Sequence, residues 1–323
     1  MKIEEFLLRT YATYIRRQLP SCVDKLASVL YSRMVLIPKI NRFYKDKLND
    51  EQADLINYLR RHGGVLFPFT DEYLYENLKV PVFRCKETKL LYVEIDNKRL
   101  YLKKMQKRVA RKYFRSIASE MDIRSPHRYV TSENRMIGAL ENSEKINQSV
   151  GHCVEHGDVV IDIGAAEGNF SISVAEEAER IYLFEASGEW VNALKRTFLP
   201  YKDKTVITQC RVSDFSDDKT MRIDDFFKLG TITPALQMDS KLFIKIDVEG
   251  HEMCVLHGME ALLRTFKNIK VSIAVYHNPE DASEVEKYFN EVWGECMFEY
   301  TNGYAMFPDK APYFRKAVLR IRR

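Results

Sequence analysis

The chain of 323 residues has only six cysteines, and no two of them form a C-x-x-C pair. Scattered thiols favour free cysteines in a reducing compartment over a disulfide framework. No apolar run reaches the roughly 18 residues that a membrane-spanning helix needs. The first residues, M-K-I-E-E-F-L-L-R-T, carry acids early and no long apolar segment, which argues against a secretory signal. We therefore expect a cytoplasmic protein.

The net charge of the chain is small, but positive and negative residues are unevenly distributed along it. The net charge is +4, yet residues 1–130 carry 27 Lys+Arg against 15 Asp+Glu, about +12, which leaves about −8 for the remainder. A basic N-terminal part suggests an anionic partner such as a phosphate-bearing substrate, nucleic acid or an anionic surface. A solvated basic face is the alternative.

Strand and helix patterns alternate after about residue 157. Apolar runs predict strands at 159–163, 181–184, 206–212, 242–247 and 269–276, with helical patterns between them. This predicts an α/β fold with a mostly parallel sheet covered by helices on both faces, ending in an antiparallel hairpin of residues 297–307 and 316–321. In residues 1–130, apolar spacing predicts helices, including one over 6–19, and alternation predicts a β-hairpin that turns at Asp96-Asn97. Another helix is expected from about Asn134. We therefore expect two parts, residues 1–130 and 131–323.

The segment V-V-I-D-I-G-A-A-E-G-N-F, residues 159–170, predicts a strand, a tight turn and a helix N-terminus. Gly164 and Gly168 permit backbone angles and close approaches that a Cβ would block. Asp162 can hold the turn or accept a hydrogen bond from a ligand's ammonium. Since Ala165 and Ala166 follow Gly164, the middle glycine of the dinucleotide fingerprint G-x-G-x-x-G is missing, which argues against an NAD-type dehydrogenase.

Ligand-competent residues follow five successive predicted strands, at the edge where open α/β sheets bind ligands. Glu185 lies about 20 residues past the glycine turn, where an acid holds ribose hydroxyls in nucleotide-type sites. Ser213 and Asp214 are placed to reach an adenine amine. Each residue alone has an ordinary alternative as a surface acid or a turn residue. In strand order the set is Gly164, Ala165, Glu167, Gly168 and Asn169; Glu185; Ser213 and Asp214; Asp247; His277 and Asn278.

Two motifs resemble a known family. D-I-G-A-A-E-G-N-F is similar to motif I of class I S-adenosylmethionine (SAM) methyltransferases, and K-I-D-V-E-G-H-E with V-L-H-G, residues 245–258, resembles the hallmark of FkbM-type methyltransferases. The upstream L-L-Y-V…K-R-L-Y-L and S-P-H-R-Y segments resemble a bacterial subgroup associated with polysaccharide biosynthesis. The resemblance implies a Rossmann-like domain over residues 131–323 that binds SAM through Asp162, Gly164, Gly168 and Glu185. It also implies methyl transfer to a hydroxyl, often of a sugar. The basic charge of residues 1–130 separately suggests acceptor binding there, and within residues 82–130 we expect Lys98, Arg99, Lys103 and Lys104 to help bind a sugar that carries phosphate.

An alcohol acceptor must lose a proton, so either a general base or a metal ion is needed. The base candidates are His251, His277 and Asp247, although His251 can instead cap the following helix and Asp247 can instead contact SAM. Asp247, His277 and Asn278 form an alternative metal group. We rank a metal below a histidine base, because magnesium prefers oxygen ligands. His127 and Arg128, in a predicted loop, can reach the site or lie on the surface.

Two further classes remain open. The basic, tyrosine-containing N-terminal part is compatible with an RNA-binding protein or RNA methyltransferase. No RNA-binding signature is present, however, and no N-P-P-Y or D-P-P-Y motif follows the fourth strand, so a saccharide or small-molecule acceptor, phosphate-bearing or not, is preferred over nucleic acid. A scaffold that kept the fold without catalysis is the other alternative.

Overall fold

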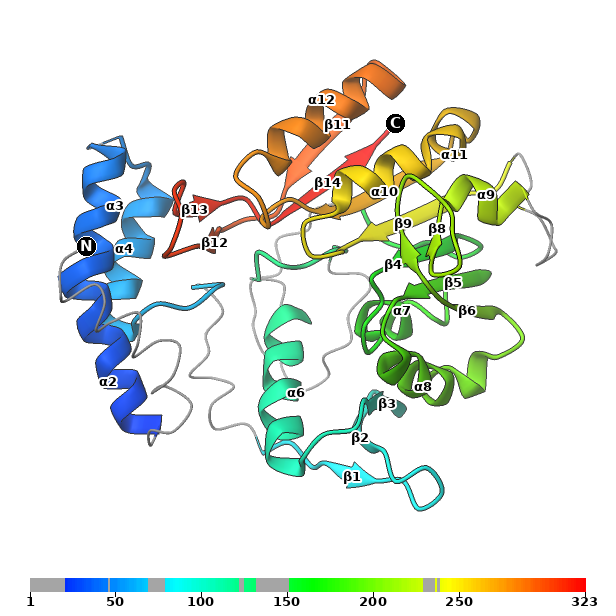
Figure 1. Ribbon diagram of the computed structural model, residues 1–323, viewed down its shortest axis with the longest axis horizontal. Helices are drawn as coiled ribbons and strands as arrows, with labels where there is room; N and C mark the ends of the chain where they lie inside the picture. The colour runs from blue at the N-terminus through cyan, green and yellow to red at the C-terminus, as the bar shows by residue number, and fades with distance from the viewer. Residues whose placement is uncertain are drawn as a thin grey trace. The chain divides into compact units, whose positions relative to one another are not determined.

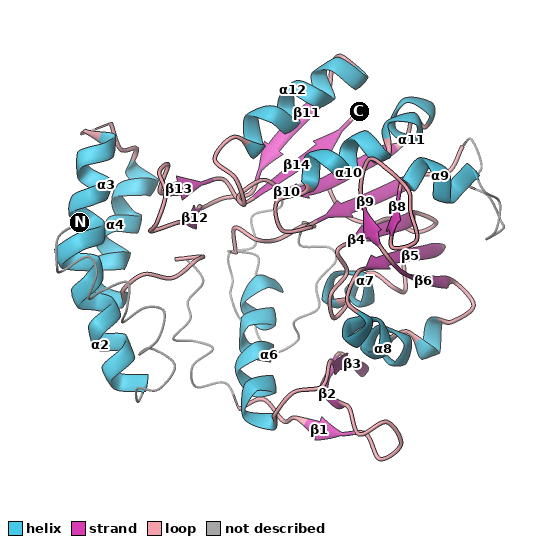
Figure 2. Cartoon of the chain, viewed as in Figure 1, coloured by secondary structure: helices cyan, strands magenta, loops and turns pink. Residues whose placement is uncertain are grey.

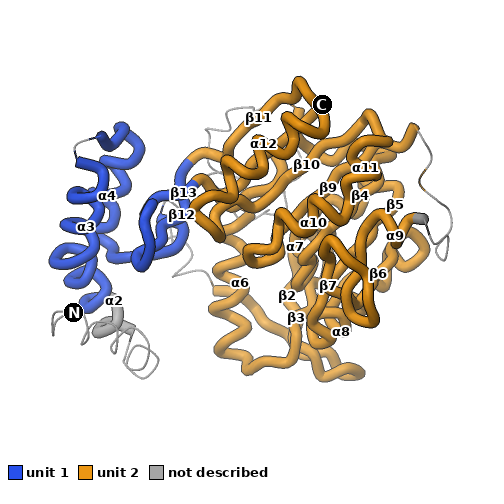
Figure 3. Tube along the Cα trace, turned by 45° about the horizontal axis from the view of Figure 1, so that its top comes forward, with its two compact units in different colours: residues 1–69, 303–315 blue, residues 70–302, 316–323 orange. Residues whose placement is uncertain are grey.

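The computed structural model describes residues 21–45, 47–68, 79–121, 125–131, 151–228, 236 and 239–323. The chain divides into two compact units (Figure 3): unit 1 contains residues 1–69 and 303–315, and unit 2 contains residues 70–302 and 316–323. The helices predicted over residues 6–19 and from Asn134 lie outside the described residues. No helix within the described ranges is long and apolar enough to cross a membrane.

Unit 1 has a small helical core. Asn49 begins α4 with a capping box, because its side chain accepts a hydrogen bond from Gln52 N (2.8 Å) and the Gln52 side chain accepts one from Asn49 N (3.2 Å). Leu55 and Leu59 of α4 pack with Leu36 and with residues of the second segment, Tyr304, Met306 and Phe314. The elements are α2 (Ser21–Tyr31), the π-helical turn η2 (Ser32–Leu36), α3 (Ile37–Tyr44), α4 (Asp50–His62), β12 (Ala305–Met306) and β13 (Phe314–Arg315).

Unit 2 is organised around a seven-stranded sheet in the order β11-β14-β10-β9-β4-β5-β6 (Figure 1). Strands β10, β9, β4, β5 and β6 run parallel, whereas β14 is antiparallel to both β10 and β11. The chain order reverses between β4 and β9, and ligands of open sheets bind beside such a switch point. The bounds are β4 (Val159–Ile163), β5 (Arg180–Glu185), β6 (Thr205–Gln209), β9 (Leu242–Ile246), β10 (Ile269–Ala274), β11 (Met297–Tyr300) and β14 (Val318–Arg322).

Helices cover both faces of this sheet (Figure 2). Successive side chains of β4 divide between the two layers: Ile161 packs with α9, α10, α11 and α12, whereas Val160 packs with α6, α7 and α8. Tyr182 and Ile181 of β5 divide in the same way. This confirms the predicted α/β fold with a mostly parallel sheet and a C-terminal antiparallel pair. The helices are α6 (Lys107–Met121), α7 (Asn169–Ser173), α8 (Gly188–Thr197), η4 (Leu199–Tyr201), α9 (Ile223–Lys228), α10 (Glu252–Gly258), α11 (Glu260–Thr265) and α12 (Asp281–Trp293).

The predicted hairpin is present as β2 (Leu91–Ile95) and β3 (Lys98–Leu102), with β1 (Phe83–Arg84) beside β2. Asp96 and Asn97 adopt φ of 47° and 62°, which short polar side chains tolerate in two-residue turns. The hairpin and α6 belong to unit 2, so the compact units do not divide at residue 130. An acceptor-binding role for residues 1–130 stays a prediction.

One predicted strand is too long. The strand expected over 206–212 ends as β6 at Gln209, and Arg211–Val212 form β7, which pairs with β8 (Thr220–Met221) outside the main sheet. β7 and β8 run parallel, and the loop that joins them contains a turn in which Asp217 accepts hydrogen bonds from the backbone N–H groups of Lys219 and Thr220, at 2.8 and 2.7 Å.

Candidate active site

The turn after β4 leaves no room for a side chain at its first position. Gly164 has a φ of 78°, and a Cβ built there would lie 1.8 Å from the carbonyl oxygen of Asp247. The N–H groups of Gly164 and Ala165 both donate to Phe184 O, at 3.0 and 3.2 Å. Only glycine fits this position. The ends of β4, β5 and β9 are thereby joined through backbone atoms.

Glu185, the last residue of β5, holds the same turn from the other side. Its Oε2 accepts a hydrogen bond from Ala166 N (2.9 Å), and its Oε1 accepts one from Ser187 N (2.7 Å). Ala166 adopts a φ of 46°, a conformation that needs such support. The carboxylate therefore orders the turn, whatever it also contributes to a ligand.

Asp162 faces the protein interior. Lys245 Nζ lies 3.1 Å from Asp162 Oδ1 and donates to Gly164 O at 2.6 Å, while Ser171 Oγ donates to Asp162 Oδ2 at 2.7 Å. Burial disfavours the ammonium, but Asp162 and Asp247 outweigh that effect and raise the pKa of Lys245. Asp162 thus contacts the turn only through Lys245, and both roles expected for it stay predictions.

Helix α6 contacts the glycine turn through one tyrosine. Tyr113 Oη donates to Glu167 Oε2 at 2.7 Å, and the Tyr113 ring packs 5.6 Å from that of Trp190. Burial and the nearby Glu120 disfavour a charged carboxylate and raise the pKa of Glu167 to about 7. Burial also raises the pKa of Glu120. Two acids with weakened ionisation thus lie close to the turn.

Asp247, which follows β9, is the centre of a polar cluster. Tyr129 Oη donates to Asp247 Oδ2 at 2.7 Å, and His127 Nε2 lies 3.4 Å from the same oxygen. His127 Nε2 is also 2.9 Å from Tyr129 Oη and 3.1 Å from Tyr276 Oη. The loop of residues 125–131 and the ends of β9 and β10 all contribute side chains.

Burial and the neighbouring charges shift the pKa of each acid in this cluster. Burial acts to raise the pKa of Asp247, but His127, Lys245 and Tyr129 outweigh it and hold that pKa well below its usual value. Burial raises the pKa of Tyr129 and of Tyr276. Asp247 is therefore a carboxylate at neutral pH, and both phenols remain protonated hydrogen-bond donors.

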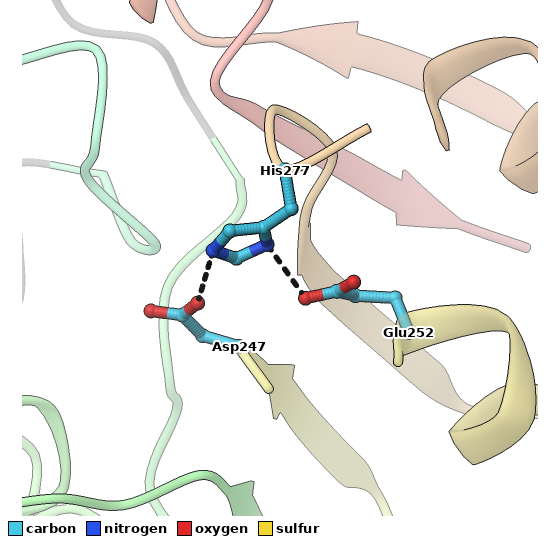
Figure 4. A group of neighbouring side chains, drawn as sticks. All are labelled: Asp247, Glu252 and His277. Atoms are coloured by element: carbon cyan, nitrogen blue, oxygen red, sulfur yellow. Dashed lines mark ion pairs between the residues drawn. The ribbon is translucent and has the colours of Figure 1, made fainter. Parts of the chain in front are cut away.

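A second imidazole faces Asp247 from β10 (Figure 4). His277 Nε2 lies 3.7 Å from Asp247 Oδ1 and 3.6 Å from Glu249 Oε2, while Nδ1 lies 2.9 Å from Glu252 Oε1. Glu252 Oε1 also accepts hydrogen bonds from Val248 N (3.1 Å) and Gly250 N (3.4 Å). The buried Glu252 therefore orders the loop after β9 and holds one nitrogen of His277.

Comparison with known proteins assigns the domain. The family model described as "Methyltransferase FkbM domain" matches residues 123–300, more than half of the chain. The chain belongs to the FkbM methyltransferase family. The matched residues include the glycine turn, Glu185 and the Asp247 cluster of the FkbM domain.

Several solved structures are similar to this FkbM chain. The FkbM methyltransferase of Methylobacillus flagellatus KT is 19% identical with a TM-score of 0.40; the alignment covers 51% of this chain and 43% of that one, less than half its length. Trm5b from Pyrococcus abyssi is 13% identical with a TM-score of 0.37, and the alignment covers 72% of this chain and 55% of Trm5b. SMU.1697c from Streptococcus mutans, in complex with SAH, is 9% identical with a TM-score of 0.35, and the alignment covers 52% of this chain and 89% of SMU.1697c. A search of curated proteins gave no match.

The structure brings some of the predicted FkbM-domain residues together and separates others. Asp247 and His277 face each other as expected. His251 precedes α10 with an exposed side chain that makes no capping hydrogen bond. Ser213 Oγ donates to Asp214 Oδ1 at 3.0 Å, and Asp214 is exposed. Asn278 is engaged with Asp281, to which its Nδ2 donates at 3.1 Å.

Sequence reasoning missed several members of the cluster. No local pattern in the sequence indicates Tyr129, Tyr276 or Glu252, and the sequence alone places His127 either in the site or on the surface. His127 is only 8% exposed and Arg128 only 4%, which decides against the surface alternative. The S-P-H-R-Y segment held the available signal, but its contact with Asp247 joins residues more than 100 positions apart.

The basic residues expected to bind the acceptor are mostly engaged elsewhere. Lys98 Nζ donates to Ile172 O at 3.2 Å, and Arg99 Nε donates to Glu94 Oε1 at 3.1 Å. Lys103 Nζ lies over the Trp190 ring, 4.9 Å from its centroid. Lys104 is exposed. An exposed basic row instead lies on α6, at Lys107, Arg108, Arg111 and Lys112.

Proposed function

We propose that this FkbM chain is a SAM-dependent O-methyltransferase that acts on a hydroxyl of a sugar or glycan precursor, as in polysaccharide biosynthesis. The observation that supports it most directly is the ionised Asp247, held by Tyr129 at the switch point of the sheet and backed against Gly164. Membership of the family supports methyl transfer from SAM. A carboxylate beside two imidazoles suits an acceptor that must lose a proton.

The residues around the glycine turn fit a cationic cofactor. Gly164 lets the backbone of the turn lie directly against the chain after β9. Glu167 carries a carboxyl whose pKa is raised to about 7, and a neighbouring cation would favour its charged form. We propose a SAM site made of Asp162, Gly164, Ala165, Glu167, Gly168, Asn169, Glu185, Ser213, Asp214 and Asp247.

The chain's own residues orient the acceptor and accept its proton. SAM supplies the methyl group, which an oxygen accepts in line with the departing sulfur. Tyr129 fixes Asp247 through Oδ2, so that Oδ1 is directed toward the site. The base candidates are His251, His277 and Asp247, and the structure adds His127, whose Nε2 contacts Asp247, Tyr129 and Tyr276. Among the histidines, the buried position of His127 and the partly buried position of His277 favour these two over the exposed His251.

Calorimetry with SAM tests the cofactor half of the proposal, and acceptor screening tests the other half. Wild-type protein is expected to bind SAM in the micromolar range and to methylate a nucleotide sugar or phosphosugar, with the product identified by mass spectrometry. Absence of SAM binding by well-folded protein would overturn the methyltransferase proposal. SAM binding with turnover only on non-saccharide hydroxyls would overturn the acceptor class alone.

An RNA methyltransferase is the second candidate, favoured by the exposed basic row on α6. The side chains of this row, at Lys107, Arg108, Arg111 and Lys112, form no hydrogen bond or ion pair with any described residue. Such a row would bind a phosphate backbone with strong salt dependence. RNA retention at physiological salt, with RNA methylation exceeding that of any saccharide, would favour this candidate.

A further inference from the structure

The facing atoms of Asp247 and His277 have the arrangement of two ligands of one metal ion. Each side chain is held by an outer partner on its far side: Asp247 Oδ2 by Tyr129 Oη at 2.7 Å, and His277 Nδ1 by Glu252 Oε1 at 2.9 Å. On the sides that face each other, Asp247 Oδ1 and His277 Nε2 lie 3.7 Å apart (Figure 4). The contact at Asp247 is a hydrogen bond and the contact at His277 is an ion pair, and ligating carboxylates and histidines are commonly oriented by outer partners of these kinds.

The distance between the two facing atoms suits an ion better than a direct bond. Nε2 and Oδ1 are 3.7 Å apart, longer than a hydrogen bond. Two ligands bound about 2.0–2.2 Å from one ion at a tetrahedral angle lie roughly 3.4 Å apart. Asp247 Oδ1 is buried and accepts no hydrogen bond from a described residue, which an ion at this position would correct.

Glu252 supports the same conclusion from the protein side. Its side chain is 1% exposed, yet one of its oxygens, Oε2, is buried without a hydrogen-bond partner among the described residues. Ligand atoms of Asp247, Glu252 and His277 all lie within 4.8 Å of one another. Glu249 Oε2 lies 3.6 Å from His277 Nε2 on an exposed side chain that is free to turn toward an ion. Three carboxylates thus surround one imidazole, a negative cluster that a divalent cation would neutralise.

The donor atoms indicate which class of ion fits. Magnesium and calcium select all-oxygen sites, whereas an imidazole nitrogen combined with carboxylates suits first-row transition ions such as Mn²⁺, Fe²⁺ or Zn²⁺. We propose that Asp247 Oδ1 and His277 Nε2, completed by Glu249, bind one such divalent ion, with Glu252 as the positioning residue for His277. Resting on the proposed function, we assign to the ion the binding of the acceptor hydroxyl, whose pKa it would lower. Asp247 and His277 then act as ligands, which leaves His127 as the favoured base among the candidates.

Mn²⁺ titration of the metal-stripped full chain tests the site without turnover. The EPR signal of free Mn²⁺ should show one saturable site, for which Zn²⁺ competes and Mg²⁺ at equal concentration does not. Asp247→Asn and His277→Gln should each weaken Mn²⁺ binding at least tenfold, and Glu252→Gln by about tenfold or more through loss of orientation. His257→Gln removes an exposed histidine of α10 and should leave Mn²⁺ affinity unchanged.

The outcomes separate this inference from the proposed function. Far-ultraviolet circular dichroism first establishes that each variant is folded, and calorimetry measures SAM binding on the same samples. Wild-type protein that binds SAM but not Mn²⁺, or Mn²⁺ binding that survives Asp247→Asn and His277→Gln, overturns the metal site and leaves the proposed function standing. Mn²⁺ binding that is lost in both variants, by a protein that does not bind SAM, supports the metal site and contradicts the proposed function.

Discussion

A Cβ on Gly164 would lie 1.8 Å from the carbonyl oxygen of Asp247 and 2.9 Å from its carbonyl carbon. The backbone N–H of Asp247 in turn donates to Ile163 O at 3.1 Å. The ends of β4 and β9 are therefore in backbone-to-backbone contact. Gly164 of the proposed cofactor site and Asp247, a candidate base, therefore share one backbone junction.

Gly164→Ala is expected to be strongly destabilising, by about 2–4 kcal/mol, because it combines a strained positive φ with a backbone clash. The matched control is Gly157→Ala, which has a similar φ of 86° but nothing within 4 Å of its Cβ, and should cost only about 1 kcal/mol. Urea unfolding of both variants makes the comparison. If the two variants lose equal stability, the backbone around Gly164 and Asp247 can shift to make room for the added Cβ.

Glu185→Ala is expected to weaken SAM binding at least tenfold and also to lower the stability of the cofactor-free chain by about 1–3 kcal/mol. Both follow from the loss of the acceptor for Ala166 N and Ser187 N. Glu189→Ala, which removes an exposed glutamate four residues later, is the control. Weaker SAM binding with unchanged stability would mean that Glu185 acts only on the ligand, and unchanged binding would remove it from the site.

The raised pKa of Glu167 predicts that the stability of the folded chain depends on pH. The folded chain keeps this carboxyl protonated up to about pH 7, whereas the unfolded chain releases the proton near pH 4.5. The folded state binds more protons between these values, so the contribution of Glu167 to stability falls as the pH rises through this window. Glu167→Gln removes that loss and should gain up to about 3 kcal/mol over wild type between pH 4.5 and 8. Urea unfolding at pH 5 and pH 8 measures the free energy of unfolding of both proteins. If the difference between Glu167→Gln and wild type does not grow with pH, the raised pKa assigned to Glu167 is wrong.

The same group predicts proton release when SAM binds near pH 7, because a cation beside Glu167 favours the carboxylate. Calorimetry in two buffers of different ionisation enthalpy would detect the proton. Glu167→Gln should abolish the buffer dependence. If it persists undiminished in that variant, the proton comes from another group.

Tyr129→Phe and His127→Gln are expected to lower kcat by about 10²–10³-fold while changing SAM affinity by less than about threefold. Both variants disturb the carboxylate of Asp247 rather than the glycine turn. Tyr201→Phe is the matched control, since Tyr201 also donates from its phenol to a carboxylate, Glu176, but at an exposed position. Steady-state kinetics with the identified acceptor measures kcat and KM for each variant. A drop confined to KM would assign these residues to acceptor binding alone.

Neutralising Arg108, Arg111 and Lys112 to glutamine is expected to raise the KM for a phosphate-bearing acceptor and to spare SAM affinity. On a helix these residues lie away from Tyr113, which contacts Glu167, so they would bind the distal anionic part of an extended acceptor. Removing i,i+4 like-charge pairs should also stabilise α6 slightly, by about 0.2–0.5 kcal/mol per pair. Neutralising Lys98 and Arg99, which have protein partners, should affect stability more than KM. An unchanged KM in both sets would leave the basic row as a solvated surface.

The central sheet could be predicted because its signals are local. The run from Val159 to Ile163 is fully buried and apolar except for Asp162, and Gly164 marks the close approach of two backbones. Asp96 and Asn97 likewise carry their turn conformation in their own side chains. In each case neighbouring residues along the sequence are enough to specify the structure.

The cluster around Asp247 could be predicted only in part, because its contacts are long-range. Asp247 and His277 were found as strand-end residues, which the parallel sheet brings together. Tyr129 and His127 reach Asp247 from a loop whose position depends on the packing of α6 and β10, and no local pattern encodes that. Glu252, at the start of α10, has the pattern of an ordinary first-turn acid, and only the structure shows that it holds His277.

Strand β14 lies between β10 and β11, although residues 318–322 follow both of them in the chain. A ribosome therefore releases β11 before the strand beside which it belongs has been translated, with residues 303–315 of unit 1 still to come. Until then β10 exposes a row of unpaired backbone groups, the kind of edge to which other nascent chains attach. The sheet can close only after residues 318–322 have been translated, and chaperone binding should be greatest just before they emerge.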